Sequence, residues 1–334
     1  MNTYHIKSVY LKDSRIEKYF SDKDWKRADK KEKNVTLLYL DYLNIYDRKY
    51  WSYHSKIKNL IGEDKHKFTD KSNLDFYIQK PFTLYTYPYS IGQNLESFKN
   101  RFKKDKKYIL KPTKGREGIG IEIVKNYHEL TKFFDVDVKK IDFKGVKERQ
   151  KWVIQEYLEN PMLYQNRKFH LRVYFLIVDT KIYYFTRYLI ITAAKEYKNS
   201  DFDNKEIHDS HYGENSIRNK IFPEDFMEKD YIEKINKDID KMFRDLKSNL
   251  KLPMNCYPED DNCYEVFAAD IMITKTGDIK VLEFNHSVGY PESMDKRYPL
   301  FENGLDIVLN HYGYLEEDKM MKENFYRDVE KLNL

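Results

Sequence analysis

The chain has 334 residues, of which 41% are hydrophobic and 34% are charged. This balance is typical of soluble globular proteins and excludes a disordered or fibrous chain. The 60 Lys and Arg residues against 55 Asp and Glu residues give a formal charge of +5, which permits an acidic partner without requiring one. The length suffices for one large domain or for two or three small ones that share a core.

The lack of targeting segments and the use of cysteine both favour the cytoplasm. No apolar run reaches transmembrane length, and the first 20 residues lack the uninterrupted apolar core of a secretory signal. Cys256 and Cys263 form neither a zinc motif nor a disulfide framework, which fits a reducing compartment. We therefore expect a cytoplasmic monomer with no membrane or nucleic-acid partner.

The first third of the chain has mixed patterns. Residues 35–43 predict a buried strand or the start of a helix. A helix start at Thr69 and Asp70 places Lys71 in the first turn of that helix. A short amphipathic helix follows within residues 95–102, and its apolar side is expected to be core.

Residues 108–125, YILKPTKGREGIGIEIVK, predict two strands joined by a basic loop. The first strand ends at Lys111, and the second covers residues 119–124. Glycines let backbone N–H groups approach phosphate oxygens closely, and a lysine at a strand end can bind a phosphate as a point charge. The loop joins strand to strand, so it is neither a Walker loop nor a dinucleotide fingerprint. A simple hairpin loop remains the alternative. Its glycines are Gly115, Gly118 and Gly120.

Residues 152–188 predict three strands that carry cations. A strand over residues 152–155 runs into a linker, and strands over residues 169–178 and 182–188 follow. Lys168, Arg172 and Arg187 lie in or beside these apolar strands. A buried cation is costly unless it meets an anion, so the pattern favours a nucleoside triphosphate or an acidic substrate. Structural salt bridges are the alternative.

The remaining scaffold is predicted from periodicity. Residues 189–221 are polar and predict a loop, and residues 223–250 predict a long amphipathic helix. A second amphipathic helix is expected near the C-terminus, with Met320, Phe325, Val329 and Leu332 on its apolar side.

Residues 264–289 predict a β-hairpin with a turn at Gly277. Asp270 lies in its first strand, and Glu283 and Asn285 lie two residues apart in the second, on one face. Three oxygen ligands that converge in this way would suit Mg²⁺. A surface hairpin with ordinary polar positions is the alternative.

In this order and spacing, these runs resemble the tubulin–tyrosine ligase-like family of the ATP-grasp superfamily. The runs are FTDKSNL, YILKPTKGREGIGI, WVIQEYLENPMLYQNRKFHLRVY, the strand with Arg187, and YEVFAADIMI with IKVLEFN. The resemblance covers roughly residues 57–290 and implies an α/β (α+β) fold of mostly antiparallel sheets with flanking helices. It implies an N-terminal domain over residues 1–75 and two ATP-grasp domains, over residues 76–165 and 166–334, with the nucleotide between them.

The resemblance also implies ATP and Mg²⁺ and assigns roles to residues. The implied nucleotide-binding residues are Lys71, Lys111, Gly115, Gly118, Gln155, Glu156, Tyr157, Leu158 and Lys168. The implied catalytic residues near the γ-phosphate and the reacting carboxylate are Lys111, Arg172 and Arg187. The implied metal ligands are Asp270, Glu283 and Asn285.

Three places depart from the family pattern. His170 replaces an aspartate, His286 to Val288 replaces a run that begins with Ser-Pro, and residues 208–211 replace His-Leu-Thr-Asn. We expect these positions on the acceptor side of the site, where they bear on substrate identity more than on ATP binding.

The implied function is an ATP-dependent ligase. A protein carboxylate, such as one on an acidic tail, would be phosphorylated to an acyl phosphate and then attacked by the amine of a free amino acid. Glutamate is slightly preferred as the donor over tyrosine or glycine. One alternative is an ATP-grasp carboxylate–amine ligase that acts on a small molecule or peptide. The other is an inactive module that binds acidic protein tails.

Overall fold

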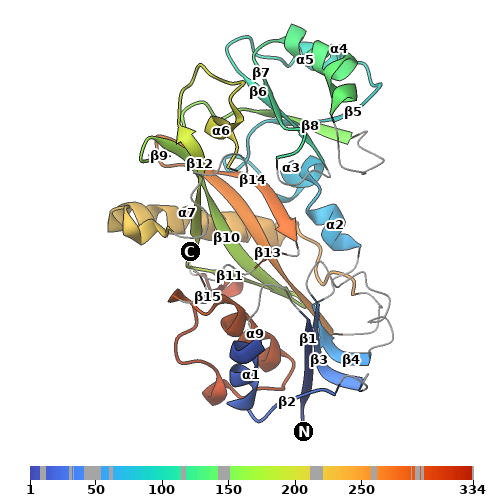
Figure 1. Ribbon diagram of the computed structural model, residues 1–334, viewed down its shortest axis with the longest axis vertical. Coiled ribbons are helices and arrows are strands. Elements are labelled where there is room, and N and C mark those ends of the chain that lie inside the picture. The colour runs from blue at the N-terminus through green and yellow to red at the C-terminus, as the bar shows by residue number, and fades with distance from the viewer. Residues whose placement is uncertain are drawn as a thin grey trace.

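The structure is a computed structural model that describes residues 1–7, 13–29, 32, 34–40, 54–59, 63–113, 118–141, 151–210, 221–256, 262–286, 288–289, 294 and 297–332. Within these residues, a mixed sheet of 11 strands forms the larger body, and a separate antiparallel sheet of four strands lies at one end (Figure 1). Both sheets and their flanking helices match the expected α/β class.

The large sheet is built along two long strands. The path runs β15-β11-β10-β13-β4-β3-β1-β2, with β9 and β12 also paired to β10 and β14 paired to β13. Strands β1 to β4 are mutually parallel, and β4 joins β13 in parallel, whereas the pairs around β10 and β13 are antiparallel. The strands are β1 (Thr3–Lys7), β2 (Lys26–Arg27), β3 (Asn34–Leu40), β4 (His54–Lys58), β9 (Leu163–Tyr164), β10 (Arg167–Val178), β11 (Lys181–Phe185), β12 (Leu189–Glu196), β13 (Asn262–Ile273), β14 (Ile279–His286) and β15 (Tyr326–Asp328).

Helices cover both faces of this sheet. Side chains alternate between the faces of a strand, and β10 divides its apolar residues accordingly. Val173, Phe175 and Ile177 pack with α7, whereas Leu176 and Val178 pack with α1 and α9. Figure 1 shows α7 crossing β10 and β13, with α1 and α9 together near the N-terminus. The helices and 3₁₀ turns of this body are α1 (Asp13–Ser21), α2 (Asp64–Phe68), η2 (Lys71–Asn73), α3 (Leu74–Tyr77), α6 (Lys205–His208), η4 (Pro223–Asp225), α7 (Lys229–Asn249), α9 (Leu300–His311), η5 (Glu317–Lys319) and η6 (Val329–Lys331).

The small sheet has its own core. Its order is β5 (Thr86–Ser90), β8 (Lys151–Glu156), β6 (Tyr108–Pro112) and β7 (Glu122–Val124). Helices α4 (Glu96–Lys99) and α5 (Tyr127–Asp135), with the turn η3 (Asp137–Lys140), accompany it. Phe98, Phe133 and Trp152 belong to one buried cluster, which confirms that the apolar side of the predicted 95–102 helix is core. That helix is only four residues long.

Three expectations about secondary structure were wrong. The strand predicted over residues 182–188 ends at Phe185, which leaves Arg187 in the connection to β12. The segment predicted as a loop over residues 189–221 contains β12 and α6. The prediction failed because polar residues dominate the segment after the apolar start of β12. The amphipathic helix predicted near the C-terminus is instead η5, β15 and η6.

The missed helix is α9, which is buried on nearly all sides. It therefore lacks the polar stripe that identifies a surface helix. Its buried acids have partners on α1: Arg15 pairs with Glu302, and the Tyr19 hydroxyl donates to Asp306 at 2.7 Å.

No described helix is both long and apolar enough to cross a bilayer.

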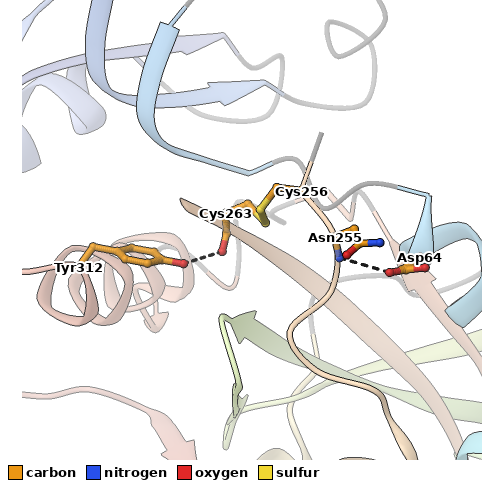
Figure 2. Close-up of a disulfide and its surroundings, with 5 residues drawn as sticks. All are labelled: Asp64, Asn255, Cys256, Cys263 and Tyr312. Carbon is orange, nitrogen blue, oxygen red and sulfur yellow. Dashed lines mark hydrogen bonds between the residues drawn. A yellow bond between two sulfur atoms is a disulfide. The ribbon is translucent and has the colours of Figure 1, made fainter. Parts of the chain in front are cut away.

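Cys256 and Cys263 form a disulfide, so the expectation that the cysteines are not bridged was wrong. The bridge links the segment after α7 to the start of β13, with its two Cα atoms 5.9 Å apart (Figure 2). On either side, the backbone N–H of Asn255 donates to Asp64 at 3.2 Å, and the Tyr312 hydroxyl donates to the Cys263 carbonyl at 2.9 Å. Two cysteines alone could not reveal this proximity, because it depends on how α7 returns the chain to β13.

Reduction of this disulfide should lower the free energy of unfolding. Its loop is short, with a sequence separation of 7, so the chain-entropy term is about 2–3 kcal/mol. Urea unfolding with and without a thiol reductant measures the difference. The variant with both Cys256→Ser and Cys263→Ser should match the reduced protein and should not respond to reductant. Equal stability of the reduced and oxidised wild type would contradict the prediction.

Candidate functional site

The hairpin of β13 and β14 brings the predicted metal ligands together. Asp270 lies directly opposite Glu283, and Asn285 lies opposite Ala268 on the same face. The register shifts after Asp270, so that Leu282 is an extra residue in β14. A bulge of this kind redirects side chains, and Leu282 and Glu283 accordingly both line the same cavity. The predicted convergence of Asp270, Glu283 and Asn285 is therefore present.

Asp270 is surrounded by donors from the adjacent strands. Arg172, its direct neighbour on β10, binds it in two places, with Nε–Oδ1 and Nη2–Oδ2 distances of 2.9 Å each. Asn285 Nδ2 donates to Oδ2 at 3.0 Å, and His170 Nε2 lies 3.8 Å from Oδ1. The cation on β10 thus meets a protein carboxylate in this structure, which is the salt-bridge alternative left open by the sequence.

Glu283 has a separate cationic partner. Lys71 Nζ lies 3.0 Å from Glu283 Oε2. Lys71 begins η2, and the Asp70 side chain caps this turn by accepting from the Ser72 N–H at 2.9 Å. Burial and the charge of Asp270 raise the pKa of Glu283, but Lys71 and Lys111 together outweigh them, and the pKa lies below its ordinary value. The predicted helix start at Thr69 and Asp70 therefore places Lys71 at the site.

Two buried lysines lie where the small and large sheets face each other. Lys111 on β6 is 7% exposed and donates to Gln155 Oε1 at 3.0 Å, and Lys168 on β10 is 8% exposed and donates to the Tyr157 hydroxyl at 2.9 Å. Burial lowers the pKa of both amines; for Lys168 burial and the charge of Lys111 lower it to about 7. No carboxylate in the described part of the chain lies within 4.0 Å of either amine. Their direct partners are neutral, and carboxylates offset the charge only from beyond 4.0 Å: Glu283, Asp209 and Asp270 for Lys111, and Asp209 for Lys168.

A cavity of about 110 Å³ joins these groups. Apolar residues from both sheets form part of its wall, including Ile109, Ile191 and Met272. Such a wall suits a planar ring, with polar groups that fix its orientation. The predicted site residues that line the cavity are Lys111, Gln155, Glu156, Tyr157, Leu158, Lys168, Asp270 and Glu283.

The other predicted residues lie outside this lining. Lys71, Arg172 and Asn285 act on it through the two carboxylates. Gly118 has a φ of 70°, a conformation that favours glycine, at the end of the loop after β6. Gly115 lies outside the described residues. Arg187 lies away from the cavity, with its guanidinium carbon 5.1 Å from the Phe325 ring centre and 5.4 Å from that of Tyr298.

The end of α6 adds wall residues that were not among the predicted site residues. His208, Asp209 and Ser210 line the cavity. His208 Nδ1 lies 2.7 Å from the Tyr157 hydroxyl, and burial lowers the pKa of His208 to about 4, so the ring is neutral near pH 7. His208 therefore holds the tyrosine that binds Lys168. The only sequence signal was the departure noted over residues 208–211.

His286 was expected on the acceptor side, and this was wrong. It lies opposite Phe267, on the face of β14 away from Glu283 and Asn285. Its ring is 4.8 Å from that of His66, and burial lowers its pKa to about 3. By contrast, His170 faces the cavity beside Asp270.

The side chains of the β13–β14 hairpin fit a Mg²⁺ ion in their donor chemistry. No group of three or more His, Cys, Asp or Glu side chains suited to a metal occurs among the described residues. The two carboxylates and the Asn285 amide are nevertheless hard oxygen donors on one face, of the type that Mg²⁺ accepts together with phosphate oxygens. Their charges are neutralised here by Arg172 and Lys71. The donor chemistry fits Mg²⁺, provided that these cations change partners.

Comparisons with known proteins give one consistent family. The sequence model described as "Tubulin-tyrosine ligase family" matches residues 33–319. Probable tubulin–tyrosine ligase PBY1 of Saccharomyces cerevisiae is 26% identical over 234 residues, covering 54% of this chain and 30% of that protein. Tubulin glycylase 3C of Tetrahymena thermophila is 32% identical over 107 residues, covering 31% and 9%. Tubulin polyglutamylase TTLL6 of Mus musculus is 22% identical over 262 residues, covering 68% and 30%. The chain thus spans less than a third of the length of each of these relatives.

Removal of the Arg172 guanidinium should destabilise the fold. Arg172→Leu leaves Asp270, which is 4% exposed, without its principal counter-ion, and the expected loss is about 3 kcal/mol of unfolding free energy. Chemical denaturation measures it, and adding Asp270→Asn should recover part of the loss. Arg27→Leu is the matched control, because the Arg27–Glu17 pair is exposed and should cost less than about 1 kcal/mol. A loss of the same size in both single variants would contradict the prediction.

Proposed function

This chain belongs to the tubulin–tyrosine ligase family, and we propose that it is an ATP-dependent ligase that joins a free amino acid to a carboxylate of a protein. The three relatives above carry tyrosine ligase, glycylase and polyglutamylase in their names. They share the formation of an amide bond but differ in the amino acid. The donor for this chain is therefore a separate question from the reaction type.

The observation that carries the proposal is the charge arrangement of the cavity. Lys111 and Lys168 are buried without a carboxylate partner among the described residues, and Asp270 and Glu283 line the same cavity. Buried cations that lack a direct ion pair favour the binding of an anion. A triphosphate would pair with the two amines, and the apolar wall would receive the adenine ring beside the Glu156–Leu158 linker. Gln155, which accepts from Lys111, would fix the orientation of that lysine.

Asp270, Glu283 and Asn285 would hold Mg²⁺ with the phosphates. When bound, the ion would neutralise negative charge on the phosphate oxygens. Lys71 and Arg172 now neutralise the two carboxylates. Lys71 and Arg172 would then be the residues that pair with the phosphates and the acceptor carboxylate. The same carboxylates can therefore hold either the resident cations or Mg²⁺.

The chemistry follows from these positions. An acceptor carboxylate oxygen attacks the γ-phosphorus of ATP, the bond to ADP breaks, and an acyl phosphate forms. The amine of the donor then attacks the acyl carbon, phosphate leaves, and an amide bond remains. Lys111 and Lys168 would stabilise charge on the phosphates, and Arg172 would hold the reacting carboxylate and its acyl phosphate. Arg187, which lies outside the cavity lining, would bind the acceptor. Positioning and electrostatic stabilisation are thus the roles assigned to this chain.

For the substrates, an acidic protein tail is the proposed acceptor, in keeping with the +5 charge and with the tubulin substrates in the relatives' names. Glutamate is the donor to test first, followed by tyrosine and glycine.

Incubation with ATP, Mg²⁺, mixed amino acids and acidic tail peptides, followed by mass spectrometry, tests the proposal. A mass increment of one amino acid names the donor. Peptide binding without any nucleotide turnover would instead favour an inactive module that binds acidic tails.

Glu283→Gln should abolish ATP turnover and leave the fold intact. The substitution keeps the shape of the side chain but removes the charge that the metal and Lys71 require. Phosphate release measures turnover, and circular dichroism checks folding. Asp278→Asn is the control, because Asp278 lies at the exposed tip of the same hairpin. Turnover in Glu283→Gln equal to that of the wild type would refute the metal assignment.

ATP affinity should fall as pH rises above 7. In the free protein, the pKa of Lys168 is lowered to about 7, so a rise from about pH 7 to about pH 8.5 removes its charge, while bound phosphates favour the protonated form. The expected loss is roughly tenfold, and binding near pH 8 should take up a proton. Titration calorimetry in buffers of different ionisation enthalpy measures both effects. In Lys168→Met, this pH dependence should disappear; its persistence there would assign it to another group.

A further inference from the structure

Arg187 is a cation held by aromatic rings instead of by a carboxylate. It lies two residues before Leu189, the residue directly opposite Arg172, in the connection between β11 and β12. Its guanidinium lies over the rings of Phe325 and Tyr298, at 5.1 Å and 5.4 Å. Its Nε is buried and donates no hydrogen bond, and no described carboxylate pairs with the side chain. The positive charge is therefore available to an incoming anion.

Arg297 provides an internal comparison at the same ring. Its guanidinium also lies 5.4 Å from the centre of Tyr298. Unlike Arg187, it is neutralised, because Asp225 lies 2.9 Å away and Glu224 lies 3.8 Å away. Contact with an aromatic ring therefore does not prevent an arginine from pairing with a carboxylate. It does not explain why Arg187 has no carboxylate partner among the described residues.

The C-terminal segment is anchored so that Phe325 stays in place. The backbone N–H and the hydroxyl of Thr186 both donate to the Phe325 carbonyl at 2.9 Å. Asn303, fully buried on α9, accepts from the Phe325 N–H at 3.0 Å and donates to the Glu323 carbonyl at 3.2 Å. Strand β15 then continues from this point and pairs with β11. Phe325 is thus fixed by Thr186, the residue directly before Arg187, and by Asn303 on α9.

We propose that Phe325 and Tyr298 are positioning residues that hold Arg187 for a carboxylate of the acidic acceptor. Rings on a guanidinium restrict its side chain without using its N–H donors, and an arginine can present two of these to one carboxylate. The family match ends at residue 319, so Phe325 and β15 extend the site beyond the matched residues. The inference rests on the proposed function for the identity of the acceptor.

Binding of a fluorescent oligoglutamate peptide tests the inference without requiring turnover. Phe325→Leu removes the ring and keeps an apolar side chain, and Phe325→Tyr keeps the ring. We expect Arg187→Gln and Phe325→Leu each to weaken binding several-fold, up to about tenfold. The double variant should be no weaker than Arg187→Gln alone, because Phe325 acts through Arg187. Phe325→Tyr should bind like the wild type.

Arg327→Leu is the matched control. Arg327 lies on β15, next but one to Phe325, with its guanidinium 5.8 Å from the Tyr184 ring, but it pairs with Asp240 at 3.1 Å. It should leave peptide affinity unchanged, even if it lowers stability. Where ligation is observed, Phe325→Leu should raise the KM for the peptide and leave the KM for ATP unchanged.

The outcomes separate the two proposals. Peptide binding with the expected pattern but without ligation would reject the proposed function and keep the docking role of Arg187. Ligation by the wild type with unchanged peptide affinity and KM in Phe325→Leu would reject the inference and keep the function. Additive losses in the double variant, or a wild type that does not bind the peptide, would also reject the inference.

Discussion

The site depends on two buried ammonium groups that have no direct carboxylate partner among the described residues. Lys111 and Lys168 are less than a tenth exposed, and burial of a charge is costly unless other interactions offset it. The structure limits this cost with neutral acceptors, Gln155 and the Tyr157 hydroxyl, and by lowering the pKa of both amines. Neutral partners can be retained when an anion enters, whereas a carboxylate would have to be displaced. The arrangement therefore favours anion binding over maximal stability of the fold.

In contrast to the two lysines, the carboxylates of the site each form a direct ion pair. Asp270 and Glu283 each have a resident cation, Arg172 or Lys71. Lys71 comes from η2 and Arg172 from β10, so segments far apart in sequence meet at this hairpin. The same two carboxylates are the residues that would hold Mg²⁺, and Lys71 and Arg172 would then pair with phosphate oxygens. The two ion pairs thus bring together the groups that the proposed reaction needs.

The sequence predicted those parts of the site that depend on strand periodicity. Asp270, Glu283 and Asn285 share a face because alternation in a strand is strict, and the same rule, applied one residue further, places His286 on the other face. What escaped prediction depends on tertiary contact. Helix α9 is buried on nearly all sides and lacks an amphipathic pattern, and Cys256 meets Cys263 through the return of α7. Strand β12 was missed because a polar segment follows it directly. The bulge at Asp270 likewise leaves no mark in the sequence.

The position of Arg187 shows why a motif alone does not define this site. A strand that ends at Phe185 leaves Arg187 outside the regular ladder, so hydrogen bonds of the sheet do not fix its direction. That direction is set by rings from residue 298 and from the C-terminal segment, both distant in sequence. Asn303 fixes the latter segment from the interior of α9. The proposed acceptor side thus depends on rings from elements that follow the β13–β14 hairpin in the chain, whereas the proposed nucleotide cavity is lined by residues within 84–210 and by the hairpin itself.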